Sequence, residues 1–199
     1  MSKVKKEGTA LIVIDLQNFL LDERAEALGI SKYAREIRVI ENTQKAIEKA
    51  RSAGIPIIYV QTILRPEILP DSGMWKMFKG MAEGISAEEI EPMMEIIKEV
   101  VPHPEDYVVR KCNCMNAFYN TDLDTILRGL KCDTLIFTGV MTNFCVETSV
   151  RAASDRGYNV LVLSDCVAAM NEESQRFPLT MVFPLLGEVT TVEELEITS

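Results

Sequence analysis

Residues 10–14 form a continuous run of apolar side chains that ends at the acidic residue Asp15. Such a run is typical of a strand buried on both faces, as in the middle of a parallel sheet. Similar strand-like runs alternate with helical patterns along the chain, and they occupy residues 55–61, 107–111, 133–139, 158–163 and 188–191. This alternation predicts an α/β fold in which helices cover both faces of a parallel sheet.

The segments between these runs carry helix signals, with one exception. Residues 33–53 have apolar side chains at helical spacing, and the pattern stops at Gly54. Ser86, followed three residues later by Glu89, predicts a capping box at the start of another helix. Residues 63–85 instead contain two prolines, three glycines and the only tryptophan, without a sustained period. We therefore expect a lid or variable binding loop there, within a single domain that spans residues 1–199.

The charge and the cysteine content argue against several kinds of partner. The chain has a net charge of −9 and no basic stripe, which argues against binding to nucleic acid. Its apolar runs are too short to cross a membrane. Its five cysteines are an odd number at irregular spacing, which is not the pattern of a disulfide framework. We expect a cytoplasmic location, where thiols stay reduced.

Three reactive side chains follow the ends of predicted strands. Asp15 ends the first strand, Lys111 ends residues 107–111, and Cys145 follows residues 133–139 at the start of a helical pattern. Because parallel strands end at the same edge of a sheet, and ligands bind at that edge, we expect the three to lie together. A thiol at a helix N-terminus forms a thiolate more easily than in water, and a nearby base and cation would activate it. Taken singly, each residue has a more common structural explanation, as a buried structural cysteine, a loop-capping aspartate or a solvated lysine.

The segments around these three residues resemble the isochorismatase-like cysteine hydrolases. That family includes nicotinamidases, N-carbamoylsarcosine amidase, biuret hydrolase and ureidoacrylate amidase. The resemblance rests on Ala-Leu-Ile-Val-Ile-Asp-Leu-Gln-Asn at 10–18, on Arg-Lys at 110–111 with Asn-Ala-Phe at 116–118, and on Thr-Gly-Val-Met-Thr-Asn-Phe-Cys-Val-Glu-Thr at 138–148. It implies a three-layer α/β/α fold, Rossmann-like and doubly wound, with a six-stranded parallel sheet.

The resemblance also implies the roles of an Asp–Lys–Cys catalytic triad. Cys145 would attack an amide carbon and form a thioester, while Asp15 would accept the thiol proton and return it to the leaving nitrogen. Lys111 would stabilise the thiolate and orient Asp15. The backbone amides of Met141 and Cys145 would form the oxyanion hole, after a cis peptide bond between Val140 and Met141. The implied activity is that of a cysteine-dependent amidohydrolase.

We expect substrate contacts from Phe19, Leu20, Trp75 and Asn116. Asn18 is followed directly by Phe19, and whether Phe19 or Leu20 faces the substrate stays open. Nicotinamidases carry an aspartate and histidines after the second strand that bind a divalent metal, whereas residues 61–71 contain no histidine. We therefore expect no metal and no cofactor, and a small carbamoyl, ureido or carboxamide compound as substrate.

Several alternatives stay open at this point. The chain could be a nicotinamidase-type or isochorismatase-type hydrolase, although members that cleave the isochorismate vinyl ether lack the cysteine. It could also be a catalytically silent binding protein on the same fold. Cys112 and Cys114 fit a redox pair, half a metal site or plain packing, and Arg65 and Arg110 fit either a carboxylate anchor or surface charges. Because members of the family that this chain resembles commonly form oligomers, we expect a homo-oligomer, either a dimer or a tetramer.

Overall fold

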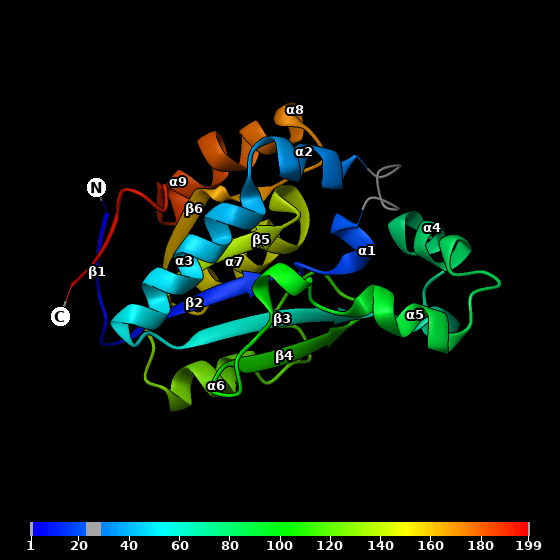
Figure 1. Ribbon diagram of the computed structural model, residues 1–199, viewed down its shortest axis with the longest axis horizontal. Coiled ribbons are helices and arrows are strands. Elements are labelled where there is room, and N and C mark those ends of the chain that lie inside the picture. Colours follow the sequence, from blue (N-terminus) through cyan, green and yellow to red (C-terminus); the bar gives the residue numbers. More distant parts are fainter. Residues whose placement is uncertain (1, 23–28, 199) are drawn as a thin grey trace.

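A six-stranded, all-parallel sheet lies at the centre of the structure, a computed structural model that describes residues 2–22 and 29–198. Its strand order is β4-β3-β2-β5-β6-β7 (Figure 1). The strands are β2 (Thr9–Ile14), β3 (Ile57–Ile63), β4 (Tyr107–Cys112), β5 (Thr134–Val140), β6 (Asn159–Ala168) and β7 (Glu188–Thr190). The order runs outward in both directions from the adjacent strands β2 and β5, which confirms the doubly wound, six-stranded sheet implied by the resemblance.

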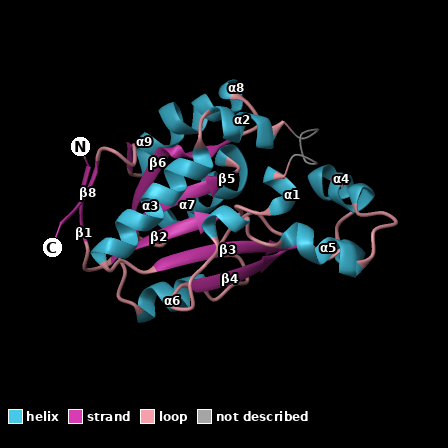
Figure 2. Cartoon of the chain, viewed as in Figure 1, coloured by secondary structure: helices cyan, strands magenta, loops and turns pink. Residues whose placement is uncertain are grey.

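The two faces of the sheet pack against two separate hydrophobic cores. Side chains alternate along β2, so that Leu11 and Val13 enter one core while Ile12 and Ile14 enter the other. The first core is covered by α2 (Ile30–Glu36) and α3 (Val39–Ala53). The second is covered by α6 (Leu123–Gly129), α7 (Glu147–Asp155) and α9 (Phe183–Leu186), so the fold has the three expected layers (Figure 2).

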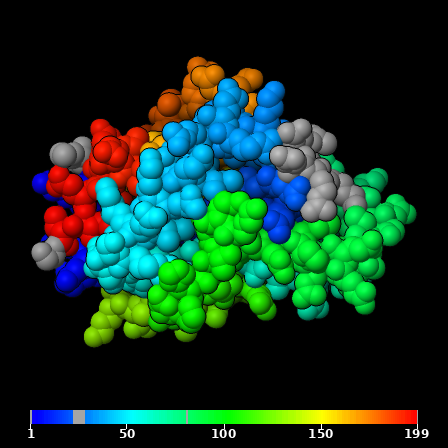
Figure 3. Space-filling view, viewed as in Figure 1, coloured from blue at the N-terminus to red at the C-terminus, as the bar shows by residue number. Residues whose placement is uncertain are grey.

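The remaining elements lie mostly beyond the two ends of the sheet. Strands β1 (Ser2–Lys5) and β8 (Leu195–Thr198) form a small parallel sheet that holds the two described ends of the chain together (Figure 3). The far end carries α1 (Asn18–Leu21), α4 (Gly73–Met81) and α5 (Ala87–Met94), with the short turn η2 (Pro66–Ile68). The turn η3 (Lys98–Val100) instead packs against α3 and the first core. In the described residues, no helix is both long and apolar enough to span a bilayer.

Two expected elements differ from the structure. The helix predicted over residues 33–53 is two helices, because the chain turns at Arg38, whose φ of 59° lies in the left-handed region. Residues 63–85 are not irregular throughout, since they contain α4 after the two prolines. The capping box is confirmed: the side chains of Ser86 and Glu89 each bond the other's backbone N–H.

Strands β2 and β5 approach each other closely at Gly139. This residue has a φ of 110°, and a Cβ added to it would lie 2.0 Å from the carbonyl oxygen of Ile14. Only glycine fits there, because any side chain would overlap the neighbouring strand. The close approach sets the end of β2, with Asp15, beside the segment that leads to Cys145.

Candidate active site

Asp15, Lys111 and Cys145 meet at the carboxyl edge of the sheet. Asp15 follows β2, Lys111 lies near the end of β4, and Cys145 lies in η4 (Thr142–Val146), a π-type turn between β5 and α7. The Lys111 Nζ atom is 2.8 Å from Asp15 Oδ2 and 3.5 Å from Cys145 Sγ. The structure therefore brings the three predicted residues into direct contact.

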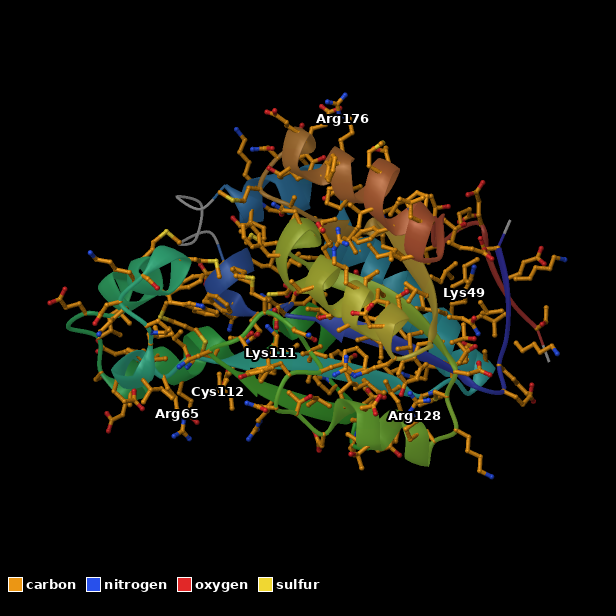
Figure 4. The ribbon with its side chains drawn as sticks, turned by 180° about the vertical axis from the view of Figure 1, so that it is seen from behind. Lys49, Arg65, Lys111, Cys112, Arg128 and Arg176 are labelled. Carbon is orange, nitrogen blue, oxygen red and sulfur yellow. The ribbon has the colours of Figure 1, made fainter. Side chains whose placement is uncertain are left out.

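Lys111 is buried, and Figure 4 shows it well inside the fold. Its ammonium group has a third partner, the carbonyl oxygen of Cys114 at 2.9 Å. Burial lowers the pKa of Lys111, but its neighbours, first among them the Asp15 carboxylate, outweigh burial and raise the pKa above its usual value. The lysine therefore stays protonated, with all three of its N–H donors directed at neighbours in the site.

The Cys145 thiol lies in a different electrostatic environment from the one expected from the sequence. Burial, followed by the negative charge of Asp15, raises the pKa of Cys145, and the opposing effect of Lys111 is smaller. The expectation of an easily formed thiolate is therefore wrong for the free protein, because desolvation exceeds the favourable field of the turn and the lysine. In the resting site the sulfur carries a proton, next to a carboxylate that can accept it.

The Asp15 carboxylate is fixed by a partner on each oxygen. The Thr62 hydroxyl donates to Oδ1 at 3.0 Å, and Lys111 holds Oδ2. The backbone of Asp15 has a φ of 51°, and its N–H donates to the Val60 carbonyl oxygen at 2.9 Å. These contacts anchor the carboxylate against β3.

Gln17 supports this arrangement, although the sequence analysis did not single it out. Its side-chain nitrogen donates to the Thr62 carbonyl oxygen at 2.9 Å and also to that of Met94, while its oxygen accepts from the Thr62 N–H at 2.7 Å. Gln17 is fully buried, so these bonds replace its contacts with water. The only signal in the sequence is its place two residues after Asp15.

A second buried glutamine holds the turn that carries the thiol. The Thr142 hydroxyl donates to Gln175 Oε1 at 2.6 Å, and the Ala169 N–H donates to the same oxygen at 2.8 Å. Gln175 lies in α8 (Glu172–Phe177) and donates in turn to the Val167 carbonyl oxygen. The end of β6 and the turn η4 are therefore tied to one side chain, which no local pattern indicated.

The peptide bond between Val140 and Met141 is cis, as the resemblance implied. The N–H groups of Phe144 and Val146 donate back to the Met141 carbonyl oxygen at 3.0 and 3.2 Å. These bonds close a tight turn between the cis bond and Cys145. Met141 and Cys145 both border the same cavity.

This cavity is small, with a volume of about 40 Å³, and it is partly open to solvent. Asp15, Thr62, Lys111 and Cys145 form its polar floor. Its walls are almost entirely apolar, and they consist of Phe19, Leu20, Leu64, Met74, Trp75, Phe78, Met115, Met141 and Phe144, with Cys114 beside them. Phe19 and Leu20 thus both border the cavity, and their contact with the substrate stays a prediction.

Helix α4 supplies one wall. Its Met74, Trp75 and Phe78 are half-buried and border the cavity, and the Phe78 ring contacts the rings of Phe19 and Trp75 at centroid distances of 6.5 and 6.1 Å. The part of residues 63–85 that was expected to close over the site is therefore a short amphipathic helix.

Asn116 does not line this cavity. Its side-chain oxygen accepts a hydrogen bond from the Phe118 N–H at 2.8 Å, and it borders a surface depression that adjoins the cavity and shares Trp75, Cys114 and Met115 with it. The geometry gives no support to the substrate contact expected of it, because the turn after β4 uses its side chain to hold the backbone.

Other candidate residues lie at the margin. Arg65 and Arg110 are exposed and do not border the cavity, and Figure 4 shows Arg65 at the periphery of the fold. Cys112 and Cys114 both have free thiols, and Cys112 is exposed. Within residues 2–22 and 29–198, no three or more His, Cys, Asp or Glu side chains are grouped to hold a metal ion. The segment after β3 does not fit the metal site of nicotinamidases.

The chain is similar to known hydrolases over nearly its whole length. The family described as "Isochorismatase domain" matches residues 9–194. The chain is 30% identical to the ureidoacrylate amidohydrolase RutB of Pseudomonas syringae pv. syringae, covering 96% of this chain and 84% of that protein. Its fold matches the crystal structure of a cysteine hydrolase from Pseudomonas syringae pv. phaseolicola, with a TM-score of 0.82, 33% identity and 96% and 92% coverage. It also matches N-carbamoylsarcosine amidase from Thermoplasma acidophilum, with a TM-score of 0.74, 26% identity and 96% and 98% coverage.

Proposed function

The chain belongs to the isochorismatase family of hydrolases, and we propose that it is an amidohydrolase that uses Cys145 as its nucleophile. The substrate is a small carbamoyl, ureido or carboxamide compound, the class to which the substrates named for its relatives belong. One observation carries this proposal: a buried ammonium group lies 2.8 Å from a carboxylate and 3.5 Å from a thiol, at the floor of a cavity.

The reaction begins with a neutral thiol. As Cys145 Sγ attacks the carbonyl carbon, its proton moves to Asp15, so that an unstable thiolate need not accumulate. The negative charge that develops on the carbonyl oxygen is stabilised by the backbone N–H groups of Met141 and Cys145. Lys111 holds Asp15 in position and stabilises the sulfur while it loses its proton.

The C–N bond then breaks. Asp15 returns the proton to the nitrogen, which leaves as ammonia or a simple amine, and Cys145 remains as a thioester. Water, deprotonated by Asp15, attacks the thioester carbon, releases the acid and restores the thiol. No step requires a metal ion.

Ammonia release from a panel of linear amides, ureido acids, biuret and nicotinamide tests the proposal. We expect turnover of at least one linear compound and a loss of at least about 1,000-fold in the Cys145→Ala variant. Intact-mass spectrometry of the quenched wild-type reaction should detect the acyl group on Cys145. Treatment with a chelator should leave the rate unchanged. Substantial turnover by Cys145→Ala would disprove the covalent mechanism, and turnover of nicotinamide alone would contradict the expected turnover of linear compounds.

A further inference from the structure

The cavity above Cys145 separates polar from apolar groups. Its polar side chains lie at the floor and bond to one another, while the walls that would surround the rest of a substrate are apolar. Four of the wall residues are aromatic: Phe19, Trp75, Phe78 and Phe144. The part of a substrate that extends beyond the polar floor would therefore contact aliphatic and aromatic side chains.

The floor has no free positive charge to offer to a substrate. Lys111 is the only cationic side chain among the described residues that line the cavity. Its three N–H donors are directed at Asp15 Oδ2, the Cys114 carbonyl oxygen and Cys145 Sγ. Its charge is balanced by the Asp15 carboxylate, so a second carboxylate placed beside it would be repelled by Asp15.

Among the described residues, the other cations close to the cavity lining in sequence lie outside the cavity. Arg65 follows the lining residue Leu64 and Arg110 precedes the lining residue Lys111, but both arginines are exposed. On α4, Lys76 lies on the exposed side and Lys79 pairs with Asp71 at 2.7 Å. The net charge of −9 adds a long-range field that disfavours anions.

We infer that the enzyme acts on amides whose acyl or ureido substituent is neutral and apolar, and that it discriminates against substrates with a carboxylate. This inference rests on the proposed function. Ureidoacrylate and N-carbamoylsarcosine, named for two relatives, both bear a carboxylate. Here such a group would be buried against apolar walls without a partner, which is unfavourable, whereas a branched alkyl or aryl group would be stabilised by the same walls.

Two matched pairs of compounds test the inference. In each pair a carboxylate is compared with an isopropyl group of the same shape: succinamate with 4-methylpentanamide, and 3-ureidopropionate with 3-methylbutylurea. We expect kcat/KM to favour the neutral member of at least one pair by about 100-fold or more. Equal or better turnover of the charged members would overturn the inference while leaving the amidase mechanism in place.

Substitutions at the wall provide a second test. Leu64→Arg introduces a guanidinium at a position that borders the cavity, and it should raise kcat/KM for succinamate by about tenfold or more. Leu64→Met, which is similar in size to leucine and carries no charge, should leave kcat/KM for succinamate unchanged. Arg65→Ala should leave kcat/KM unchanged for both succinamate and 4-methylpentanamide. A selective tenfold loss of succinamate turnover in this variant would show that Arg65 binds the carboxylate, and it would overturn the inference.

Binding to the Cys145→Ala variant separates this inference from the proposed function. Trp75 is the only tryptophan in the chain and borders the cavity, so its fluorescence reports occupancy without turnover. We expect 4-methylpentanamide to change the emission at concentrations at least about tenfold lower than succinamate. If the wild type hydrolyses neither compound but this preference holds, the assigned reaction fails, whereas the preference of the cavity for apolar over carboxylate ligands stands. If succinamate binds as tightly, or if neither compound binds, the inference is wrong.

Discussion

The Cys145 thiol lies among groups that shift its pKa in opposite directions. Its sulfur lies beside both a carboxylate and an ammonium group, but burial and the carboxylate together raise the pKa of the thiol. The Asp15 carboxylate and the Lys111 ammonium group already balance each other's charge without a thiolate at Cys145. In the proposed reaction, deprotonation is therefore coupled to attack on a carbonyl carbon, with Asp15 as the proton acceptor.

Replacement of Asp15 by asparagine should separate thiol acidity from catalysis. The change removes the negative charge that raises the pKa of Cys145 and leaves Lys111, whose charge lowers it. The pKa of the thiol should fall by about one unit or more, so alkylation of Cys145 by iodoacetamide should begin at lower pH. Amide hydrolysis should fall by about 1,000-fold because the proton acceptor is lost. Mass spectrometry of the Cys145 peptide across pH measures the first effect.

The exposed thiol of Cys112 serves as the internal reference in the same samples. Its alkylation profile should be identical in the wild type and in Asp15→Asn. An alkylation midpoint of Cys145 that stays in place, or that moves to higher pH, would contradict the proposed arrangement of charges.

Parts of the site were predictable because they depend on local sequence. Asp15, Lys111 and Cys145 each follow a strand whose apolar run is visible, and parallel strands share one edge. Gln17, Thr62 and Gln175 were not predictable in their roles, because their bonds join segments 45 and 33 residues apart. Such contacts exist only after the sheet has formed.

The secondary-structure elements show the same difference between features with a local sequence signal and features that depend on distant segments. The central strands were found because continuous burial leaves a run of apolar residues. Strands β1 and β8 were missed because they carry alternating charged residues, such as Lys3 and Glu196, and pair the two ends of the chain. The break at Arg38 was missed because no glycine or proline marks it, and α4 was missed because prolines precede it.

The contact between β2 and β5 gives a prediction for the folded core. Gly139→Ala would set a Cβ 2.0 Å from the Ile14 carbonyl oxygen, at a φ of 110°. The strands must separate, so we expect the free energy of unfolding to fall by about 3 kcal/mol or more. Urea denaturation followed by circular dichroism measures the change.

Gly54→Ala provides the matched control for this substitution. Gly54 also has a positive φ, of 73°, but a Cβ there would meet no atom within 4 Å. It should therefore show only the cost of the left-handed backbone, about 1 kcal/mol. Equal losses in the two variants would mean that the backbone conformation, and not the contact between the strands, decides the effect.

The two ends of the molecule are built from different elements. The β1–β8 pair closes the end that holds the chain termini, whereas α1, α4 and α5 surround the other end, where the sheet edge carries the cavity (Figure 1). The aromatic residues of α4, which belong to the segment expected to be a lid or variable binding loop, border this cavity. They are therefore engaged within one copy of the chain.

A different apolar surface is available for association between copies. Phe177, Met181 and Leu185 recur every fourth residue along α8, η5 (Pro178–Val182) and α9, and their side chains are 62%, 58% and 85% exposed. The opposite side of the same run is buried through Val182 and Phe183. Large apolar side chains that line up on one exposed face are typical of a surface that pairs with another protein.

We expect the chain to be a dimer or tetramer in which this stripe contacts the same stripe of a second copy, since a two-fold axis makes such a contact self-complementary. Leu185→Glu and Phe177→Glu should each shift the mass measured by light scattering at micromolar concentration towards that of the monomer, because each buries an unpaired charge at the contact. Ile68→Glu, which changes an equally exposed residue of η2 at the other end of the molecule, should leave the mass unchanged. A monomeric wild type would disprove the oligomer, and an intact oligomer in both stripe variants would show that the copies meet elsewhere.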